Sequence, residues 1–95
     1  MRHYELGFIL HPQVEQPDVT QAVERIKQYV VIGGGEVTSV DVWGRRAMAY
    51  SIGRQREGTY VFFQAQLDPG AVQGLERNLK LDEQVLRHLL LCLDN

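Results

Sequence analysis

The chain has 95 residues, of which 44% are hydrophobic and 23% charged, and its net charge is -2. These values are typical of one globular domain over residues 1–95 and exclude a disordered or fibrous protein. No apolar run approaches the roughly 20 residues of a membrane-spanning helix, and the N-terminus lacks the apolar run and cleavage site of a signal peptide. The single cysteine, Cys92, cannot form an internal disulfide, so we expect a soluble protein of a reducing compartment.

The first half of the chain predicts a strand, a helix and a long second strand. Apolar and polar side chains alternate over His3–Leu10, which is typical of a strand with one buried face. A helix is expected to begin near Pro17, because proline is tolerated in a first helical turn, and to end at the triple glycine Gly33–Gly35. A second strand is expected over Glu36–Ile52, with a β-bulge at Gly44. The helix has one apolar stripe, formed by Val19, Ala22, Val23, Ile26 and Val30.

The second half predicts a turn, a strand, a helix and a last strand. Gly53–Gly58, "GRQREG", is expected to be a polar turn, and Thr59–Leu67 is rich in strand-forming residues. Asp68, followed by proline, is expected to cap a second helix. The apolar side of that helix is Val72, Leu75 and Leu79. The last strand, Val85–Leu93, is apolar on both faces, and Cys92 is expected there as a small core residue.

The order of these elements is strand, helix, strand, strand, helix, strand. Each helix has to cross back over the sheet, and such crossovers are right-handed. The order therefore predicts an α+β, ferredoxin-like βαββαβ fold, with a four-stranded antiparallel sheet and two helices on one face. The other face of the sheet has no helix to cover it.

Residues that catalysis or metal binding would need are scattered along the chain. The histidines His3, His11 and His88 have no short helical spacing, and only one cysteine accompanies them. The triple glycine ends a helix and lacks the following Gly-Lys-Ser/Thr of a phosphate-binding loop. We therefore expect no catalytic residue, no metal site and no cofactor, and we predict that the protein is not an enzyme.

Positive charge is concentrated in one stretch of an otherwise acidic chain. Between Trp43 and Gly58 the only acid is Glu57, whereas the same stretch contains four arginines, Arg45, Arg46, Arg54 and Arg56. Arginine has a planar fork that grips phosphate and stacks on bases, so this pattern favours nucleic-acid binding. The alternative is a solvated strand end whose arginines cover apolar surface.

The direction of two neighbouring arginines depends on the strand register. Strict alternation places Arg45 and Arg46 on opposite faces of the strand. A bulge at Gly44 would shift the register and let both guanidinium groups reach one rim. The residues that follow share the parity of Arg46 and are expected to face the core; they are Met48, Tyr50 and Ile52.

A different mode of RNA binding can be tested on Arg56–Phe63, "REGTYVFF". RNA-recognition motifs carry Lys/Arg-Gly-aromatic-Gly/Ala-aromatic-Val-x-aromatic on their third strand. Arg56, Tyr60, Val61 and Phe63 match this pattern. The other positions that we compared, Glu57, Gly58 and Thr59, do not, and one of them should be a stacking aromatic. Base stacking on the open sheet is therefore the weaker of the two RNA-binding hypotheses.

Five motifs follow one another over nearly the full chain: "MRHYEL", "GGGEV", "WGRRAMAYSI", "GTYVFF" and "LKLDEQVLRHLL". In this order they resemble the bacterial small-subunit ribosomal protein six family. The third is similar to the family signature Trp-Gly-x-Arg-x-Leu-Ala-Tyr-Pro-Ile, except that Ser51 stands where a proline is common. The resemblance implies the same ferredoxin-like fold.

The resemblance also implies a structural protein that binds the central domain of small-subunit rRNA together with small-subunit ribosomal protein eighteen. Tyr4 and Tyr50 are expected in core or rim packing. The resemblance implies neither membrane binding nor a small-molecule substrate. It also implies that the protein is part of the ribosome, in the bacterial cytoplasm or in an organelle. A ferredoxin-like protein-interaction or small-molecule regulatory domain without RNA is the alternative. The implied RNA contacts are arginines: Arg2, Arg45, Arg46, Arg54, Arg56 and Arg87.

Overall fold

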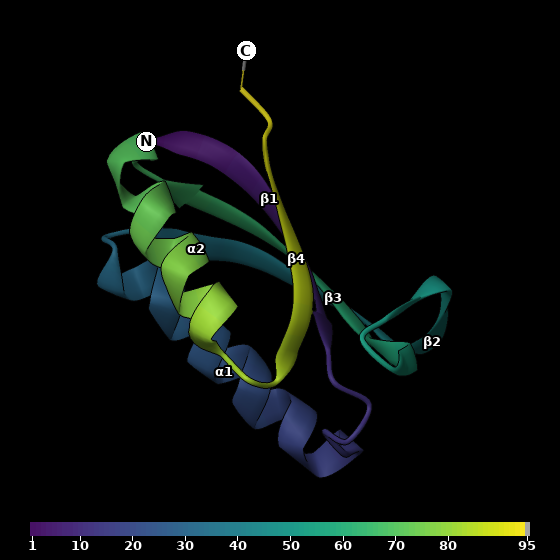
Figure 1. Cartoon of the computed structure of the whole chain (residues 1–95). Coiled ribbons are helices and arrows are strands. Elements are labelled where there is room, and N and C mark those ends of the chain that lie inside the picture. The colour runs from purple at the N-terminus through teal and green to yellow at the C-terminus, as the bar shows by residue number, and fades with distance from the viewer. Residues whose placement is uncertain (95) are drawn as a thin grey trace.

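The structure is a computed structural model that describes residues 1–94, with two helices packed on one side of a four-stranded sheet (Figure 1). All neighbouring strands are antiparallel, in the order β2-β3-β1-β4. This topology confirms the predicted ferredoxin-like fold. The elements are β1 (Arg2–Leu10), α1 (Gln16–Ile32), β2 (Glu36–Ile52), β3 (Gln55–Leu67), a 3-10 turn (Pro69–Ala71), α2 (Val72–Leu81) and β4 (Val85–Cys92).

The core lies between the helices and the two central strands, β1 and β3. Alternate side chains of both strands point into it, and the predicted apolar stripe of α1 is buried against them. Phe8 and Phe63 meet edge to face, with ring centroids 5.1 Å apart. Such aromatic pairs add to the free energy that apolar burial alone supplies. The strand contribution to the core is Tyr4, Leu6, Phe8 and Leu10 from β1, and Val61, Phe63, Ala65 and Leu67 from β3.

The ends of α1 follow the predicted signals. The helix has a proline in its first turn and the acid Asp18 beside it, and it ends before the triple glycine. Gly34 has a φ of 85°, a left-handed conformation that glycine adopts without strain, and its amide bonds the carbonyl of Val31. The start of the second helix is different, because the Asp68 side chain makes no capping hydrogen bond and lies instead 3.7 Å from the N-terminal ammonium.

A polar cluster joins α1 to the segment between α2 and β4. The carboxylate of Asp82, only 5% exposed, accepts hydrogen bonds from Arg25 Nε at 2.8 Å and from the Tyr29 hydroxyl at 2.9 Å. Arg25 Nη2 donates a third bond at 3.1 Å, and the backbone amide of Gln84 donates a fourth at 3.0 Å. Burial alone would raise the pKa of Asp82, but these donors together hold that pKa below its usual value, because they favour the ionised form.

Two sequence predictions about the strands were wrong. β3 begins at Gln55, so the turn is far shorter than Gly53–Gly58, because Gly58 and Glu57 pair with β2 in a hairpin that extends beyond the sheet. Cys92 is exposed, although its partner Tyr4 is buried. The Cys92 side chain is on the helix side of the sheet, as that of Tyr4 is, but no helix covers that side near the end of the last strand.

Candidate nucleic-acid interface

The predicted bulge at Gly44 is present in β2. The register with β3 shifts between Val42 and Gly44, and Gly44 has a φ of 87°. A Cβ added at Gly44 would meet no atom within 4 Å, so the position favours glycine for its backbone conformation and not for lack of space. The extra residue of the bulge lets Trp43 lie on the sheet face without helices, where its ring centroid is 4.6 Å from that of Phe62.

The bulge does not aim Arg45 and Arg46 at one rim. Arg45 is opposite the buried Thr59, and it bonds Glu57 at 3.1 Å and the carbonyl oxygen of Pro12. Arg46 is opposite Gly58 on the other face, where its guanidinium carbon is 5.5 Å from the centroid of the Trp43 ring. The two guanidinium groups therefore flank the hairpin, one on each side.

The remaining two arginines of the stretch are at the end of the β2–β3 hairpin, which projects beyond the rest of the sheet (Figure 1). Gly53 and Arg54 form the turn, with a φ of 61° at Gly53, and Arg56 follows on β3. The only acid of the hairpin end, Glu57, is engaged by Arg45. We call the four exposed arginines of this hairpin the basic hairpin cluster; they are Arg45, Arg46, Arg54 and Arg56.

Arg2 and Arg87 are placed differently from the cluster. Arg2 pairs with Leu67 at the opposite end of β1, about 26 Å along the strand from the hairpin side. Arg87, on β4, is opposite Ile9 at the hairpin side of the sheet. Its guanidinium donates a hydrogen bond to the hydroxyl of Tyr50 and is 5.8 Å from the centroid of that ring. The structure thus brings Arg87 near the hairpin and keeps Arg2 apart.

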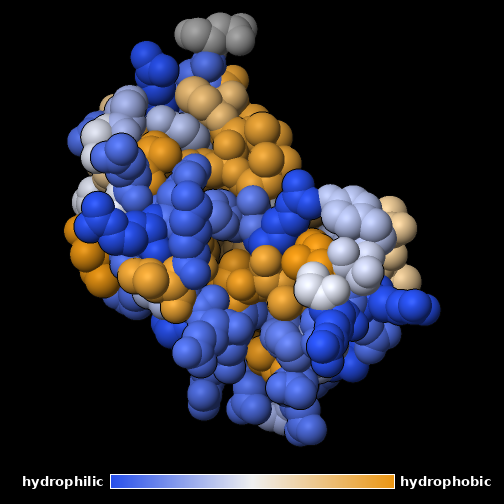
Figure 2. Space-filling view, in the orientation of Figure 1, coloured by the Kyte–Doolittle hydropathy of each residue, from blue (hydrophilic) through white to orange (hydrophobic). Residues whose placement is uncertain are grey.

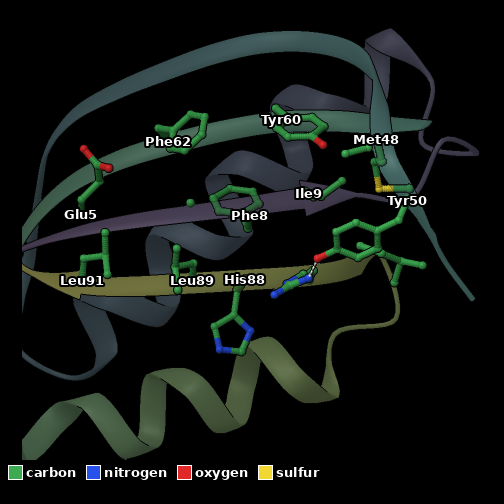
Figure 3. A pocket seen from close by; sticks show the side chains of 14 residues that line it. Glu5, Phe8, Ile9, Met48, Tyr50, Tyr60, Phe62, His88, Leu89 and Leu91 are labelled. Carbon is green, nitrogen blue, oxygen red and sulfur yellow. Dashed lines mark hydrogen bonds between the residues drawn. The ribbon is translucent and has the colours of Figure 1, made fainter. Parts of the chain in front are cut away.

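The end of β2 corrects the prediction that Met48, Tyr50 and Ile52 face the core. Tyr50 is 61% exposed, and the other two are half-buried. All three belong to the segment Met48–Ile52, which we call the strap. The strap arches over the sheet face that has no helices, and Figure 3 shows Met48 beside Ile9 and Tyr60. The three residues share the face of Arg46, as their parity predicts, but that face is the one without helices and not the core.

Under the strap the open face contains an apolar groove of about 300 Å³. Its floor comes from all three of the other strands, and Glu5 and Arg87 are the charged residues that line it. Leu89 and Leu91, 59% and 46% exposed, continue the apolar surface along β4, where Figure 2 shows hydrophobic side chains below the C-terminus. The sequence predicts that no helix covers this face, but it does not predict the groove, which depends on the path of the strap.

The histidines are separate from one another and each has a local partner. His3 Nδ1 lies 3.2 Å from the carboxylate of Asp94, His11 Nδ1 accepts the amide of Gln13 at 3.0 Å, and His88 Nε2 is 3.8 Å from Glu76. Within residues 1–94 no three His, Cys, Asp or Glu side chains are grouped as ligands for a metal ion. In the same range, no helix is long and apolar enough to span a membrane.

The chain matches known proteins over nearly its whole length. Residues 3–91 fit the sequence profile of the family described as Ribosomal protein S6. The protein named small ribosomal subunit protein bS6 of Desulforamulus reducens is 40% identical over 91 residues, which are 96% of each chain. The protein of the same name from Saccharopolyspora erythraea is 45% identical over 87 residues, which are 92% of this chain and 74% of the relative.

Solved structures agree with the sequence comparison. The crystal structure of 30S ribosomal protein S6 from Thermotoga maritima superposes with a TM-score of 0.90 at 28% identity, covering 96% of this chain and 86% of that one. The C-terminal domain of MgtC from Mycobacterium tuberculosis has a TM-score of 0.62 at 15% identity, covering 97% and 87%, and this likeness shows only that the fold is shared. The chain therefore belongs to the ribosomal protein S6 family, whose members are structural, non-enzymatic constituents of the small ribosomal subunit.

Proposed function

We propose that this protein binds the central domain of small-subunit rRNA together with small-subunit ribosomal protein eighteen. The observation that carries the RNA part is the basic hairpin cluster, which concentrates exposed arginines on a projecting hairpin of a protein with a net charge of -2. Phosphate contacts by such arginines supply most of the affinity and place the protein on its RNA. The curated relatives named above are bacterial proteins, which favours ribosomes of the bacterial cytoplasm over those of an organelle.

The arginines of the cluster are not equivalent. Arg45 already bonds Glu57 and the backbone of Pro12, so part of its hydrogen-bonding capacity is used within the protein. Arg46 lies over the Trp43 ring, a cation–π contact that uses none of the N–H donors of its guanidinium group. Arg54 and Arg56, at the exposed hairpin end, are the most accessible to a backbone passing over it. We expect Arg46, Arg54 and Arg56 to make stronger RNA contacts than Arg45. Arg2 lies at the far end of β1, so we expect it not to contact the RNA segment that the cluster binds.

The partner protein is expected on the open face of the sheet. Trp43, Leu89 and Leu91 leave apolar surface uncovered, and Leu89 and Leu91 also line the groove, which makes part of this surface concave. Exposed apolar patches of this kind mark protein interfaces. The groove is lined mainly by apolar side chains, and its one acid, Glu5, is balanced by Arg87, so it offers phosphate no net positive charge and fits a protein better than RNA. The protein would then bind its partner with the face and RNA with the hairpin.

The RNA contacts can be tested by the salt dependence of binding to a central-domain rRNA fragment in the presence of protein eighteen. Each lost phosphate contact should lower the slope of log K against log salt by about one. We expect this reduction for Arg46→Ala, Arg54→Ala and Arg56→Ala, and a smaller one for Arg45→Ala. Arg77→Ala is the matched control, because Arg77 is an exposed arginine on α2. An unchanged slope in all four cluster variants would exclude the hairpin from the RNA interface.

The partner face can be tested separately by Leu89→Asp. Leu89 is 59% exposed, so the folded protein tolerates the charge, but an apolar interface does not. We expect the variant to lose binding to protein eighteen by at least tenfold in isothermal titration, while the matched change Leu81→Asp on α2, also at an exposed leucine, leaves binding unchanged. Equal binding by both variants would remove the open face as the partner site.

Stable dimers of the chain alone, with no affinity for RNA, would favour an RNA-independent interaction domain.

A further inference from the structure

The strap, Met48–Ile52, is held to the rest of the hairpin at its two ends only. Ala47 pairs with Glu57 and Ile52 with Gln55, so four residues of β2 are opposite the single residue Arg56. The backbone between these pairs is therefore outside the regular ladder. Movement of the strap would break few sheet hydrogen bonds, which is typical of a segment that opens locally.

One contact joins the middle of the strap to the far side of the sheet. Arg87, on the edge strand β4, donates a hydrogen bond to the hydroxyl of Tyr50 and packs against its ring, as the dashed line in Figure 3 marks. The strand order puts β3 and β1 between the β2 edge and the β4 edge. The strap thus crosses the sheet and bounds the groove at its Ile9–Tyr60 end, with Tyr50 reaching β4.

We propose that the strap is a lid on the apolar groove, and that the contact between Tyr50 and Arg87 is the latch that keeps it closed. When the latch opens, Met48 and Tyr50 leave the sheet and uncover Ile9 and Tyr60, which are half-buried in the closed state. The lid thereby controls how much of the open face a partner can reach. This deepens the proposed function, because the same face is where we place the partner protein.

The latch can be tested by amide hydrogen exchange on the isolated chain. Arg87→Ala removes both parts of the contact, and Tyr50→Phe removes only the hydrogen bond. Exposed contacts of these kinds predict faster exchange of the amides in the two pairs that close the ends of the strap, Ala47 with Glu57 and Ile52 with Gln55. We expect a rise of about three- to tenfold for Arg87→Ala and a smaller rise for Tyr50→Phe. Arg77→Ala, at an exposed arginine on α2, should leave these rates unchanged.

The uncovered surface can be followed with Nile red, an uncharged dye whose binding does not depend on the lost arginine charge. We expect Arg87→Ala to increase the dye emission at least twofold, and Arg77→Ala to leave it at the wild-type level. Wild-type exchange rates in the two pairs at the ends of the strap, in both latch variants, would overturn the proposal, as would faster exchange spread evenly over the chain. Both measurements use the chain without RNA or partner protein. Their outcome therefore does not depend on whether the proposed function is correct.

Discussion

The two faces of the sheet are made by alternate residues of the same strands, yet they differ in what surrounds those residues. On the helix side, Phe63 and its neighbours are buried against α1 and α2, and the polar cluster around Asp82 is fully bonded. On the open side, the rings of Phe62 and Trp43 are in contact near the surface, with their planes tilted by 48°. The comparison indicates that the helix side of the sheet supplies stability. Side chains on the open side are not buried in the core, so this side can present apolar and basic groups to partners.

The largest difference is expected between two neighbouring phenylalanines of β3. Phe63→Ala removes a fully buried ring that contacts Phe8 and should lower the free energy of unfolding by about 3–5 kcal/mol. Phe62→Ala loses a half-buried ring in tilted contact with Trp43 and should cost about 1 kcal/mol. Urea denaturation of both variants measures this difference. Equal losses would mean that the two faces contribute alike.

The next largest effect is expected at Asp82. Asp82→Asn keeps the shape but removes the charge that Arg25 and Tyr29 bond, at a cost of about 1.5–3 kcal/mol at pH 7. The pKa of Asp82 is lower in the folded state than in the unfolded state. As the pH falls, the unfolded state therefore takes up a proton at Asp82 before the folded state does. The stabilisation is therefore complete above about pH 4 and disappears as the pH falls through the lowered pKa.

The pH dependence gives this prediction a second readout. Wild-type and Asp82→Asn unfolding free energies should converge as the pH falls toward 2, whereas at pH 7 they differ by the full amount. Glu83→Gln, at the adjacent exposed acid, is the control and should remain close to wild type at every pH. A constant gap between wild type and Asp82→Asn over this range would show that the carboxylate charge is not what stabilises the cluster.

Two glycines test whether the faces also differ in their capacity to adjust. A Cβ at Gly35 would be 2.7 Å from the carbonyl oxygen of Gln66 and 2.8 Å from the Cβ of Leu67, which cannot move away. Gly35→Ala should therefore cost about 1–3 kcal/mol. At Gly7 the obstacle is the ring edge of Phe62, 2.8 Å away, which can swing toward solvent. Gly7→Ala should change stability by less than about 1 kcal/mol, and thermal unfolding of both variants measures the contrast.

How far the sequence predicts this molecule depends on how regular each part is. The strands and helices could be predicted because periodicity and glycine or proline positions determine them locally, and Gly44 could be predicted as a bulge for the same reason. The surroundings of Tyr50 could not, because parity groups Tyr50 with Arg46 but does not say that their common face is the one without helices. The latch to Arg87 joins residues 37 positions apart, and only the folded sheet brings them together.

The smallest effect is expected at Cys92, where the helix side of the sheet ceases to be covered. Its sulfur is exposed and lies 3.5 Å from the carbonyl oxygen of Asp94, so Cys92→Ser should change the unfolding free energy by less than about 0.5 kcal/mol. The native thiol should react with Ellman's reagent at a rate within a few fold of that of the urea-unfolded chain, because access does not require opening. A native rate lower by several hundredfold would mean that the end of β4 is covered after all, and that burial on the helix side extends to the last residues of the sheet.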